Sequence, residues 1–332
     1  RHMGVDRVIY PEYLAAQEII SALKRTWARN WFELHNGRII LAGVKLRQGA
    51  PIVGMKLKDF AFTNRNFHVS AIKRNHETII PRGDDHIDAG DILYFTTTHD
   101  HIEELISLAG KCEQHIRRVL IMGGSKIAIR LVNLGHDEFK FKIIESDLER
   151  CRKLPQKCPD CEIIHGDARD TDLLADIGIA DMDAFVALTD SSETNIFTCL
   201  TAKESGVKKT VADVETIQFI SQAENLNIGT VVNKKLLASS TIFQLLLDAD
   251  SSTAKCLALA DAEVAELEAR PGSKITRSAV KDLSLPRDLT LAGLIRGEEG
   301  MLITGNTIIE PGDHVLVFCL AGALHKVEKL FN

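Results

Sequence analysis

The sequence lacks both a long apolar run and an excess of basic residues. No segment approaches the ~18 uninterrupted apolar residues that a membrane-spanning helix needs, so any link to a membrane is expected to run through a partner. Lys and Arg number 40 against 46 Asp and Glu, which gives a net charge of −6, and no long basic block offsets this deficit. Because an extended phosphate footprint needs a Lys/Arg excess, we expect no binding of nucleic acid.

Catalytic motifs are absent as well. The sequence contains no G-x-S-x-G nucleophile motif and no Cys, His and acid at a recognisable spacing. Its seven cysteines are odd in number and scattered over 332 residues, which favours reduced thiols in a cytoplasmic compartment. Arg1-His2-Met3 resemble a remnant of recombinant expression and are excluded from the interpretation. We therefore expect a cytoplasmic protein that is not an enzyme.

The sequence does contain a long internal repeat. With 45% hydrophobic and 26% charged residues, its composition is typical of a globular protein, and its length suits two or three domains. Residues 69–95 align without a gap with residues 291–317 at an offset of 222. The identical residues include Arg74 and Arg296, Glu77 and Glu299, Gly83 and Gly305, and Gly90-Asp91 and Gly312-Asp313. A period this long predicts a tandem duplication of a domain pair.

The two copies are unequal in extent. The second runs from about Arg118 to Asn332, whereas the first begins only near its last Rossmann strand and helix. Matches such as Lys58-Asp59 with Lys281-Asp282, at an offset of 223, continue the repeat upstream. We therefore expect that the beginning of the first copy is missing and that the chain is truncated at its N-terminus.

Strands and helices alternate through the first part of the second copy. The expected strands are 118–122, 139–145, 162–165, 184–188, 210–214 and 230–232, and the expected helices are 125–134, 147–154, 170–177, 193–205, 217–225 and 234–248. This alternation predicts an α/β fold with a doubly wound parallel sheet of the Rossmann type. The remainder of each copy has short strands, turn motifs and one closing helix, which predicts two small α+β subdomains.

The expected domains follow from this pattern. Residues 4–33 are the end of the first Rossmann subdomain, 34–110 the first small subdomain, 117–250 the second Rossmann subdomain and 251–332 the second small subdomain. A linker is expected near Asp250-Ser251-Ser252.

The turn after residues 118–122 is the expected nucleotide site. In a G-x-G-x-x-G template, Gly123 is intact, Ser125 replaces the second glycine and Ala128 is an accepted third residue. Glu145 follows Gly123 by 22 residues, near the ~20 expected for the acid that binds ribose hydroxyls. That acid opposes a 2′-phosphate, so NAD(H) or an adenine nucleotide is favoured over NADP. The alternative is a decayed pocket that serves only for packing.

Metal sites are weaker alternatives. Cys158 and Cys161, with Cys151 and His165 nearby, have spacing compatible with zinc, and His99-Asp100-His101 could also bind a metal. The cysteine pair flanks a surface loop while His165 ends a strand, so we expect no metal site. Asp91 and Asp313 are interpreted as turn acids in hairpins.

The motif order resembles the RCK (KTN) domain family. The resemblance rests on residues 123–127, 144–147, 166–168, 187–190 and 191–195, and for the small subdomains on residues 87–91 and 309–313. Two such units in tandem are similar to TrkA-type regulatory subunits of prokaryotic Trk potassium uptake systems. The resemblance covers essentially the whole chain after residue 3.

The resemblance implies a regulatory role without catalysis. Members of the family bind NAD(H) or ATP/ADP, assemble as homo-oligomers on the cytoplasmic face of the membrane, and control a TrkH-like subunit that translocates potassium. The implied binding residues are Gly123, Gly124, Ser125, Lys126, Ile127, Glu145, Asp167, Ala168, Leu188 and Thr189. Two residues depart from the family pattern: Ser125 interrupts the glycine loop, and Asp213 stands where many relatives carry a basic residue.

Ligand binding is expected to shift the domain pair between two arrangements, with the helices at 12–26 and 234–248 carrying the change. An NAD-dependent oxidoreductase and a structural assembly module with a degenerate pocket remain the alternatives.

Overall fold

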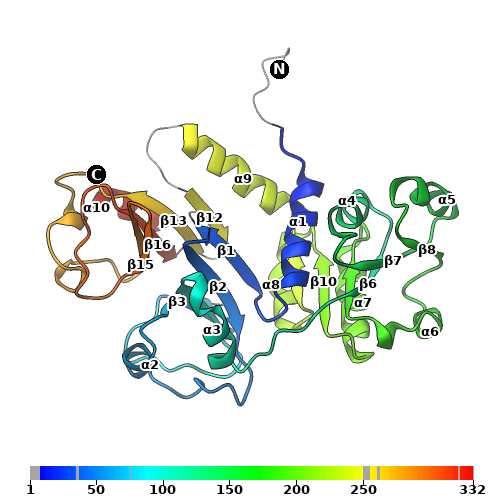
Figure 1. Ribbon diagram of the computed structural model, residues 1–332, viewed down its shortest axis with the longest axis horizontal. Helices are drawn as coiled ribbons and strands as arrows, with labels where there is room; N and C mark the ends of the chain where they lie inside the picture. Colours follow the sequence, from blue (N-terminus) through cyan, green and yellow to red (C-terminus); the bar gives the residue numbers. More distant parts are fainter. Residues whose placement is uncertain are drawn as a thin grey trace, which may run out of the picture. The chain divides into compact units, whose positions relative to one another are not determined.

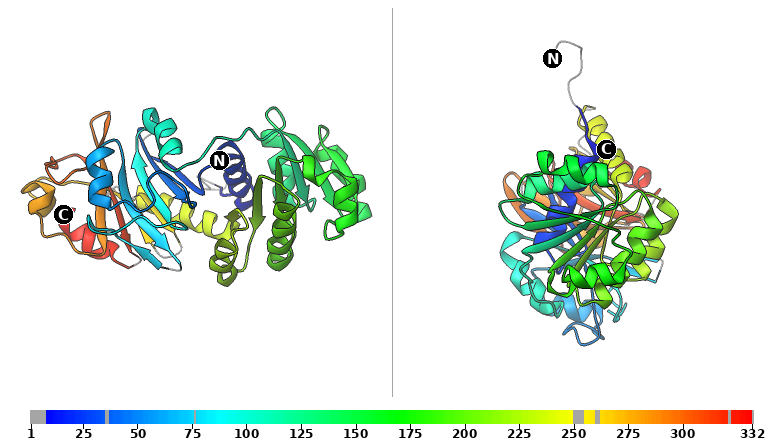
Figure 2. Two further views of the ribbon diagram at one scale, coloured as in Figure 1. Left: turned by 90° about the horizontal axis from the view of Figure 1, so that it is seen from below. Right: turned by 90° about the vertical axis from the view of Figure 1, so that its right-hand side faces the viewer.

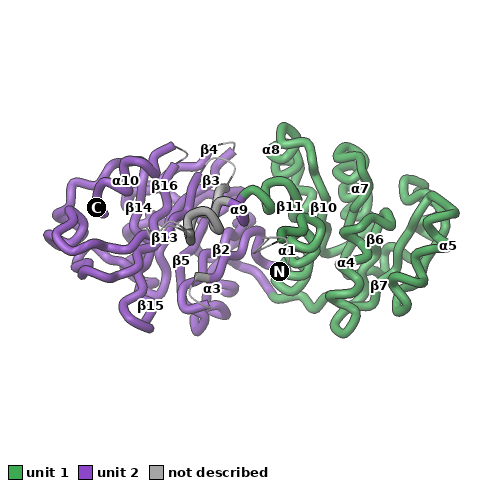
Figure 3. Tube along the Cα trace, turned by 90° about the horizontal axis from the view of Figure 1, so that it is seen from above, with its two compact units in different colours: residues 1–26, 113–239 green, residues 27–112, 240–332 purple. Residues whose placement is uncertain are grey.

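The computed structural model describes residues 8–34, 37–75, 77–249, 255–259, 262–320 and 322–331 (Figure 1). The chain forms two compact units, residues 1–26 with 113–239 and residues 27–112 with 240–332 (Figure 3). The linker expected near Asp250-Ser251-Ser252 lies outside the described residues. Within the described residues, no helix is long and apolar enough to cross a bilayer.

The first unit is built on a parallel six-stranded sheet. Its order is β11-β10-β9-β6-β7-β8 and every pairing is parallel. In chain order the strands are β6 (Arg118–Met122), β7 (Lys140–Glu145), β8 (Glu162–His165), β9 (Ala184–Ala187), β10 (Lys209–Asp213) and β11 (Thr230–Val232). This is the strand order 3-2-1-4-5-6 of dinucleotide-binding folds, so the predicted Rossmann-type sheet is confirmed.

Helices cover both faces of this sheet (Figure 2). They are α4 (Lys126–Gly135), α5 (Leu148–Lys157), α6 (Thr171–Asp176), α7 (Ser192–Glu204) and α8 (Ile217–Asn225), with a 3₁₀ turn at Ile179–Asp181, and α9 (Lys234–Ala249) follows β11. Several start one residue later than predicted because the residue before them is an N-cap. The capping side chains of Ser125, Asp147 and Asp170 accept hydrogen bonds from backbone N–H groups of the first turn.

A helix of the first copy completes this unit. Helix α1 (Pro11–Lys24) packs against α4. Its Ala15, Ala16 and Ile19 are fully buried in one core with Leu131 of α4 and Val119 of β6. Small side chains on α1 allow this close approach, so the first copy contributes one layer to the fold of the second.

The second unit contains two antiparallel sheets with the same strand order. One is β1-β2-β5-β3-β4, made of β1 (Asn30–Leu34), β2 (Ile39–Lys45), β3 (His68–Arg74), β4 (Glu77–Ile79) and β5 (Ile92–Thr97). The other is β12-β13-β16-β14-β15, made of β12 (Lys255–Leu259), β13 (Ala262–Glu268), β14 (Leu289–Arg296), β15 (Glu299–Leu302) and β16 (His314–Leu320). Their helices are α2 (Leu57–Thr63), α3 (Ile102–Leu108) and α10 (Leu324–Phe331), with 3₁₀ turns at 99–101, 274–276 and 280–282.

The repeated residues form the same buried ion pair in each copy. Asp91 is 2% exposed and accepts hydrogen bonds from Arg74 Nε and Nη2 at 2.9 and 2.7 Å. Asp313 is also 2% exposed and accepts from Arg296 Nε and Nη2 at the same distances. The glycine before each aspartate has a positive φ, 97° for Gly90 and 89° for Gly312. The aspartates do lie in turns as predicted, but these turns are not hairpins, because β5 and β16 do not pair with the strands that precede them. The aspartates also pair with the repeated arginines.

The two sheets pack face to face, which the sequence analysis did not anticipate. Leu41 and Tyr94 of the first sheet share a core with Leu316 and Phe318 of the second, and the rings of Tyr94 and Phe318 lie 5.5 Å apart. The small subdomains therefore form one unit with a common core.

Two domain boundaries differ from those expected. Residues 27–33 belong to the second unit because β1 pairs with β2 and Trp27 is buried in the core of that subdomain. The later division falls between Ser239 and Ser240, inside α9, and not near residue 250.

Candidate nucleotide-binding site

A pocket of about 190 Å³ lies where β6, β7, β8 and β9 end. It is lined by Met122, Gly123, Gly124, Ser125, Ile144, Glu145, Ser146, Arg150, Gly166, Asp167, Ala168, Leu188, Thr189 and Asp190. Ligands of open parallel sheets bind at this carboxyl edge. Its volume is below the ~300–1,000 Å³ of pockets that enclose drug-sized ligands, so it would enclose only part of a dinucleotide.

The loop after β6 begins with two glycines that neighbouring groups approach closely. Gly123 has φ +95°, and a Cβ there would lie 3.0 Å from the carbonyl oxygen of Leu188. A Cβ on Gly124 would lie 2.6 Å from Leu154 Cδ1 and 3.1 Å from Glu145 Oε2. A side chain at Gly123 would be strained by its positive φ and by the Leu188 backbone, whereas one at Gly124 would require the ends of the Leu154 and Glu145 side chains to shift.

Ser125 is the N-cap of α4. Its Oγ accepts a hydrogen bond from Ala128 N at 3.3 Å, which satisfies one of the N–H groups that a helix start leaves without a partner. This local role accounts for serine in place of the second glycine of the template. The start of α4 still presents backbone N–H groups and the positive end of a helix dipole.

Glu145, the predicted ribose-binding acid, ends β7 and is 5% exposed. Its Oε2 accepts a hydrogen bond from Gly124 N, and its Oε1 accepts one from Asp147 N, both at 2.8 Å. Arg150 Nη1 lies 4.0 Å from Oε2. The carboxylate thus ties the glycine loop to the start of α5, and because two oxygens offer about four lone-pair sites, it retains capacity for ligand hydroxyls.

Asp167 is held by its neighbour Arg169. The guanidinium donates to both carboxylate oxygens, at distances from 2.6 to 3.0 Å, and lowers the pKa of Asp167. On the other side of the pocket, Thr189 Oγ1 donates to Asn195 Oδ1 at 2.6 Å. These contacts fix the polar groups on the pocket wall before any ligand binds.

Eight of the ten predicted binding residues line this pocket; Lys126 and Ile127 do not, and a part of their backbone N–H groups in binding stays a prediction. Ile127 is 3% exposed and faces the core, while Lys126 is exposed and lines a different groove. Both follow the N-cap, so the helix turns their side chains away. The sequence analysis missed Arg150 and Ser146; a basic residue in the first turn after the ribose acid was the feature that could have identified Arg150.

The alternative metal ligands do not converge. Cys151 Sγ and Cys161 Sγ donate to the carbonyl oxygens of Glu145 and Phe141, and Cys158 is buried in the core. His165 Nε2 lies 3.1 Å from the carbonyl oxygen of Ser146. Within the described ranges, no cluster of three or more His, Cys, Asp or Glu could hold a metal ion.

Comparisons with known proteins agree with this architecture. The TrkA-N domain matches residues 119–234, and the TrkA-C domain matches residues 41–110 and 264–332. The chain is 30% identical to the Trk system potassium uptake protein TrkA of Halomonas elongata, covering 99% of this chain and 73% of that protein. It is 28% identical to a TrkA homolog of Archaeoglobus fulgidus, with coverage of 99% and 74%.

Among solved structures, the GsuK RCK domain superposes with a TM-score of 0.53 at 15% identity, covering 99% of this chain and 71% of that one. This likeness shows a shared RCK fold. Together with the sequence matches, it establishes that the chain belongs to the family of the Trk system potassium uptake protein TrkA.

Proposed function

We propose that this chain is a cytoplasmic, nucleotide-sensing regulatory subunit of a potassium uptake system. The observation that carries the proposal is the glycine loop after β6, which a buried carboxylate, Glu145, holds against the carboxyl edge of a Rossmann-type sheet. The names of the relatives support a role in potassium uptake. The ligand we propose is NAD(H) or ATP/ADP, and the GsuK channel has been solved bound to NAD.

Different residues of the pocket suit different parts of a nucleotide. Backbone N–H groups at the start of α4 suit the phosphates, Glu145 suits the ribose hydroxyls, and residues 167–168 and 188–189 would line the adenosine side. Arg150, at the mouth of the pocket, adds a positive charge that offsets the nearby acids. A bound nucleotide would bridge the glycine loop and the neighbouring strand ends.

The regulatory action is a population shift. A ligand changes the balance between two arrangements only if it binds one of them more tightly. We propose that the chain works as a homo-oligomer on a TrkH-like membrane subunit, and that nucleotide occupancy biases the arrangement that this partner recognises.

An oxidoreductase is the less favoured candidate. Such an enzyme needs a general base that faces the substrate. Two of the three carboxylates that line the pocket are already engaged, Glu145 by backbone N–H groups and Asp167 by Arg169. This pattern suits binding better than proton transfer.

Titration calorimetry with NADH, NAD, ATP and ADP tests the proposal. We expect at least one nucleotide to bind the wild type and to lose most of its affinity in Glu145→Ala. Glu162→Ala is the matched control, because Glu162 begins β8, away from the pocket, and should leave binding unchanged. Absence of binding by all four nucleotides would refute the proposed function.

A further inference from the structure

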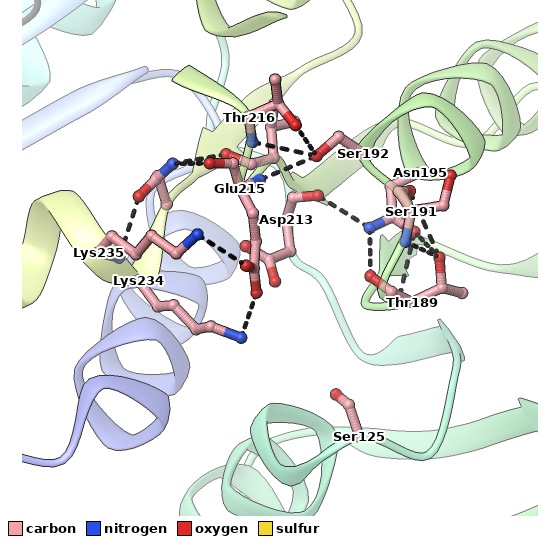
Figure 4. A network of polar contacts seen from close by, with 12 residues as sticks. Ser125, Thr189, Ser191, Ser192, Asn195, Asp213, Glu215, Thr216, Lys234 and Lys235 are labelled. Atoms are coloured by element: carbon pink, nitrogen blue, oxygen red, sulfur yellow. Dashed lines mark hydrogen bonds and ion pairs between the residues drawn. The ribbon is translucent and has the colours of Figure 1, made fainter. Parts of the chain in front are cut away.

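Hydrogen bonds, together with the backbone of residues 213–215, join the pocket to the first turn of α9 (Figure 4). The connection begins at Thr189, which lines the pocket after β9. The backbone N and Oγ1 of Thr189 donate to Asn195 Oδ1 at 3.1 and 2.6 Å. Asn195 lies on α7 and is fully buried. The pocket wall is thus fixed to a side chain that no ligand would touch.

Asn195 also holds the end of the neighbouring strand. Its Nδ2 donates to the carbonyl oxygens of Thr189 and Asp213 at 2.9 and 2.8 Å. Both donors and the acceptor of this amide are used, and its partners lie at the ends of β9 and β10. A displacement of Thr189 therefore either moves the end of β10 or breaks buried hydrogen bonds, which costs about 1–3 kcal/mol for each group left without a partner.

Asn233 continues the connection to α9. Its Nδ2 donates to the carbonyl oxygens of Val214 and Glu215, at 2.7 and 3.3 Å, just after β10. Its Oδ1 accepts from Lys235 N and Leu236 N at 3.0 and 2.9 Å, in the first turn of α9. One side chain thus serves as the helix cap and as the link to the strand.

Ion pairs strengthen the same junction. The Glu215 carboxylate pairs with Lys234 and, at 3.3 Å, with Lys235. Helix α9 then carries the chain out of the first unit, which ends at Ser239, into the second, which resumes at Ser240. A shift of the ends of β9 and β10 would therefore reach the first turn of α9, the helix through which the chain passes from one unit to the other.

One member of this network is unsatisfied. Asp213 is 3% exposed, and within the described residues its Oδ1 has no hydrogen-bond partner. Burial of such a group without a partner costs free energy, which a movement that gave this oxygen a partner would recover.

We propose that Asn195 and Asn233 are positioning residues that couple occupancy of the pocket at Thr189 to the orientation of α9. This inference rests on the proposed function, because it concerns how binding at the same pocket is transmitted. The connection runs from Thr189 through Asn195 to the end of β10, and from there through Asn233 to the first turn of α9.

Hydrogen–deuterium exchange on the full chain, with NADH and in a second arm ADP, tests the coupling. In the wild type, we expect saturating nucleotide to change exchange in residues 234–239 by at least about fivefold. The Asn233→Ser variant keeps an oxygen at the N-cap but loses the amide donors to Val214 and Glu215. It should bind within about twofold of the wild-type affinity, and its exchange response in α9 should be lost.

Asp170→Ser is the matched control, because it alters the N-cap of α6 outside this network and should keep the α9 response. If Asn233→Ser does not fold, Asn195→Asp serves, since it keeps the acceptor for Thr189 and removes the donors to Thr189 and Asp213. A variant with unchanged affinity and an unchanged α9 response would overturn the coupling alone. Absence of nucleotide binding to the wild type would overturn the proposed function and this inference with it.

Discussion

Asp213 is a buried carboxyl group whose ionisation costs stability. It ends β10, is 3% exposed, and burial raises its pKa to about 6. Because the charged form is disfavoured in the folded protein, the folded state binds the proton more tightly than the unfolded state. The free energy of unfolding should therefore fall as pH rises from about 4 to about 6.

The substitution Asp213→Asn removes this titration. We expect it to raise the free energy of unfolding by about 2 kcal/mol at pH 7.5 and to have little effect near pH 3.5, where the carboxyl group is protonated in both states. Urea denaturation at the two pH values measures the difference. Equal effects at both would contradict the account.

A comparison of substitutions at Gly123 and Gly206 distinguishes the effect of backbone strain from that of steric contact. Their φ angles are +95° and +94°, but a Cβ on Gly123 meets the carbonyl oxygen of Leu188 at 3.0 Å whereas one on Gly206 meets nothing within 4 Å. We expect Gly206→Ala to cost about 1 kcal/mol and Gly123→Ala about 1–3 kcal/mol more, with loss of nucleotide binding. Thermal denaturation and calorimetry measure the two effects, and similar destabilisation by both would show that the loop tolerates a side chain.

Among single residues, the sequence pointed to those whose expected role follows from their distance along the chain to a motif. Glu145 was located because the acid of a βαβ unit lies about 20 residues beyond the first glycine. Lys126 and Ile127 do not line the pocket, because adjacency to a glycine loop does not give the direction of a side chain once the helix has begun. Asn195 and Asn233 were missed as network members because their partners are backbone carbonyls of other strands, which no spacing rule specifies.

At the scale of elements, the repeated Arg–Asp pair stabilises each small subdomain. Burial alone would raise the pKa of Asp313, but its hydrogen bonds with Arg296 and with the N–H of Glu310 lower it. This contribution to stability is present above the unfolded pKa of about 3.9 and is lost as pH falls through the folded value.

We expect Asp313→Asn to lower the free energy of unfolding by about 2–4 kcal/mol at pH 7, because it leaves a half-buried guanidinium without its bidentate partner. Lys58→Ala is the control, since Lys58 and Asp84 form an exposed pair that solvent screens. Urea denaturation of both variants measures this difference. Losses of equal size would show that the buried pair contributes no more than a surface one.

Element types were predictable because apolar periodicity and N-cap residues are local properties. The packing of the two small sheets was not predicted, although one feature pointed to it. Strand β16 reads HVLVFCL, an almost continuous apolar run, and both of its faces are buried. An antiparallel strand with one solvated face would alternate, so such a run indicates a second layer.

At the scale of the whole molecule, the two copies of the repeat contribute side chains to common cores. Helix α1 from the first copy completes the core of the Rossmann-type unit, and the two small subdomains share a core. The internal repeat predicted the duplication but not these pairings, because contacts between copies depend on faces that each copy presents only after folding.

The division into two units predicts where a nucleotide stabilises the chain. A ligand at 100 times its Kd stabilises the form that binds it by about 2.7 kcal/mol. We expect that stabilisation to appear as slower hydrogen exchange in residues 118–232, with residues 37–75 and 262–320 little changed outside the neighbourhood of α9. Equal protection throughout the chain would show that the two units unfold as one.

The most direct test of the central claim is a crystal structure of the full chain soaked with the nucleotide that calorimetry identifies. We predict ligand density between the loop after Met122 and the carboxylate of Glu145. Density at another site, with this pocket vacant in a protein that binds the nucleotide in solution, would contradict it.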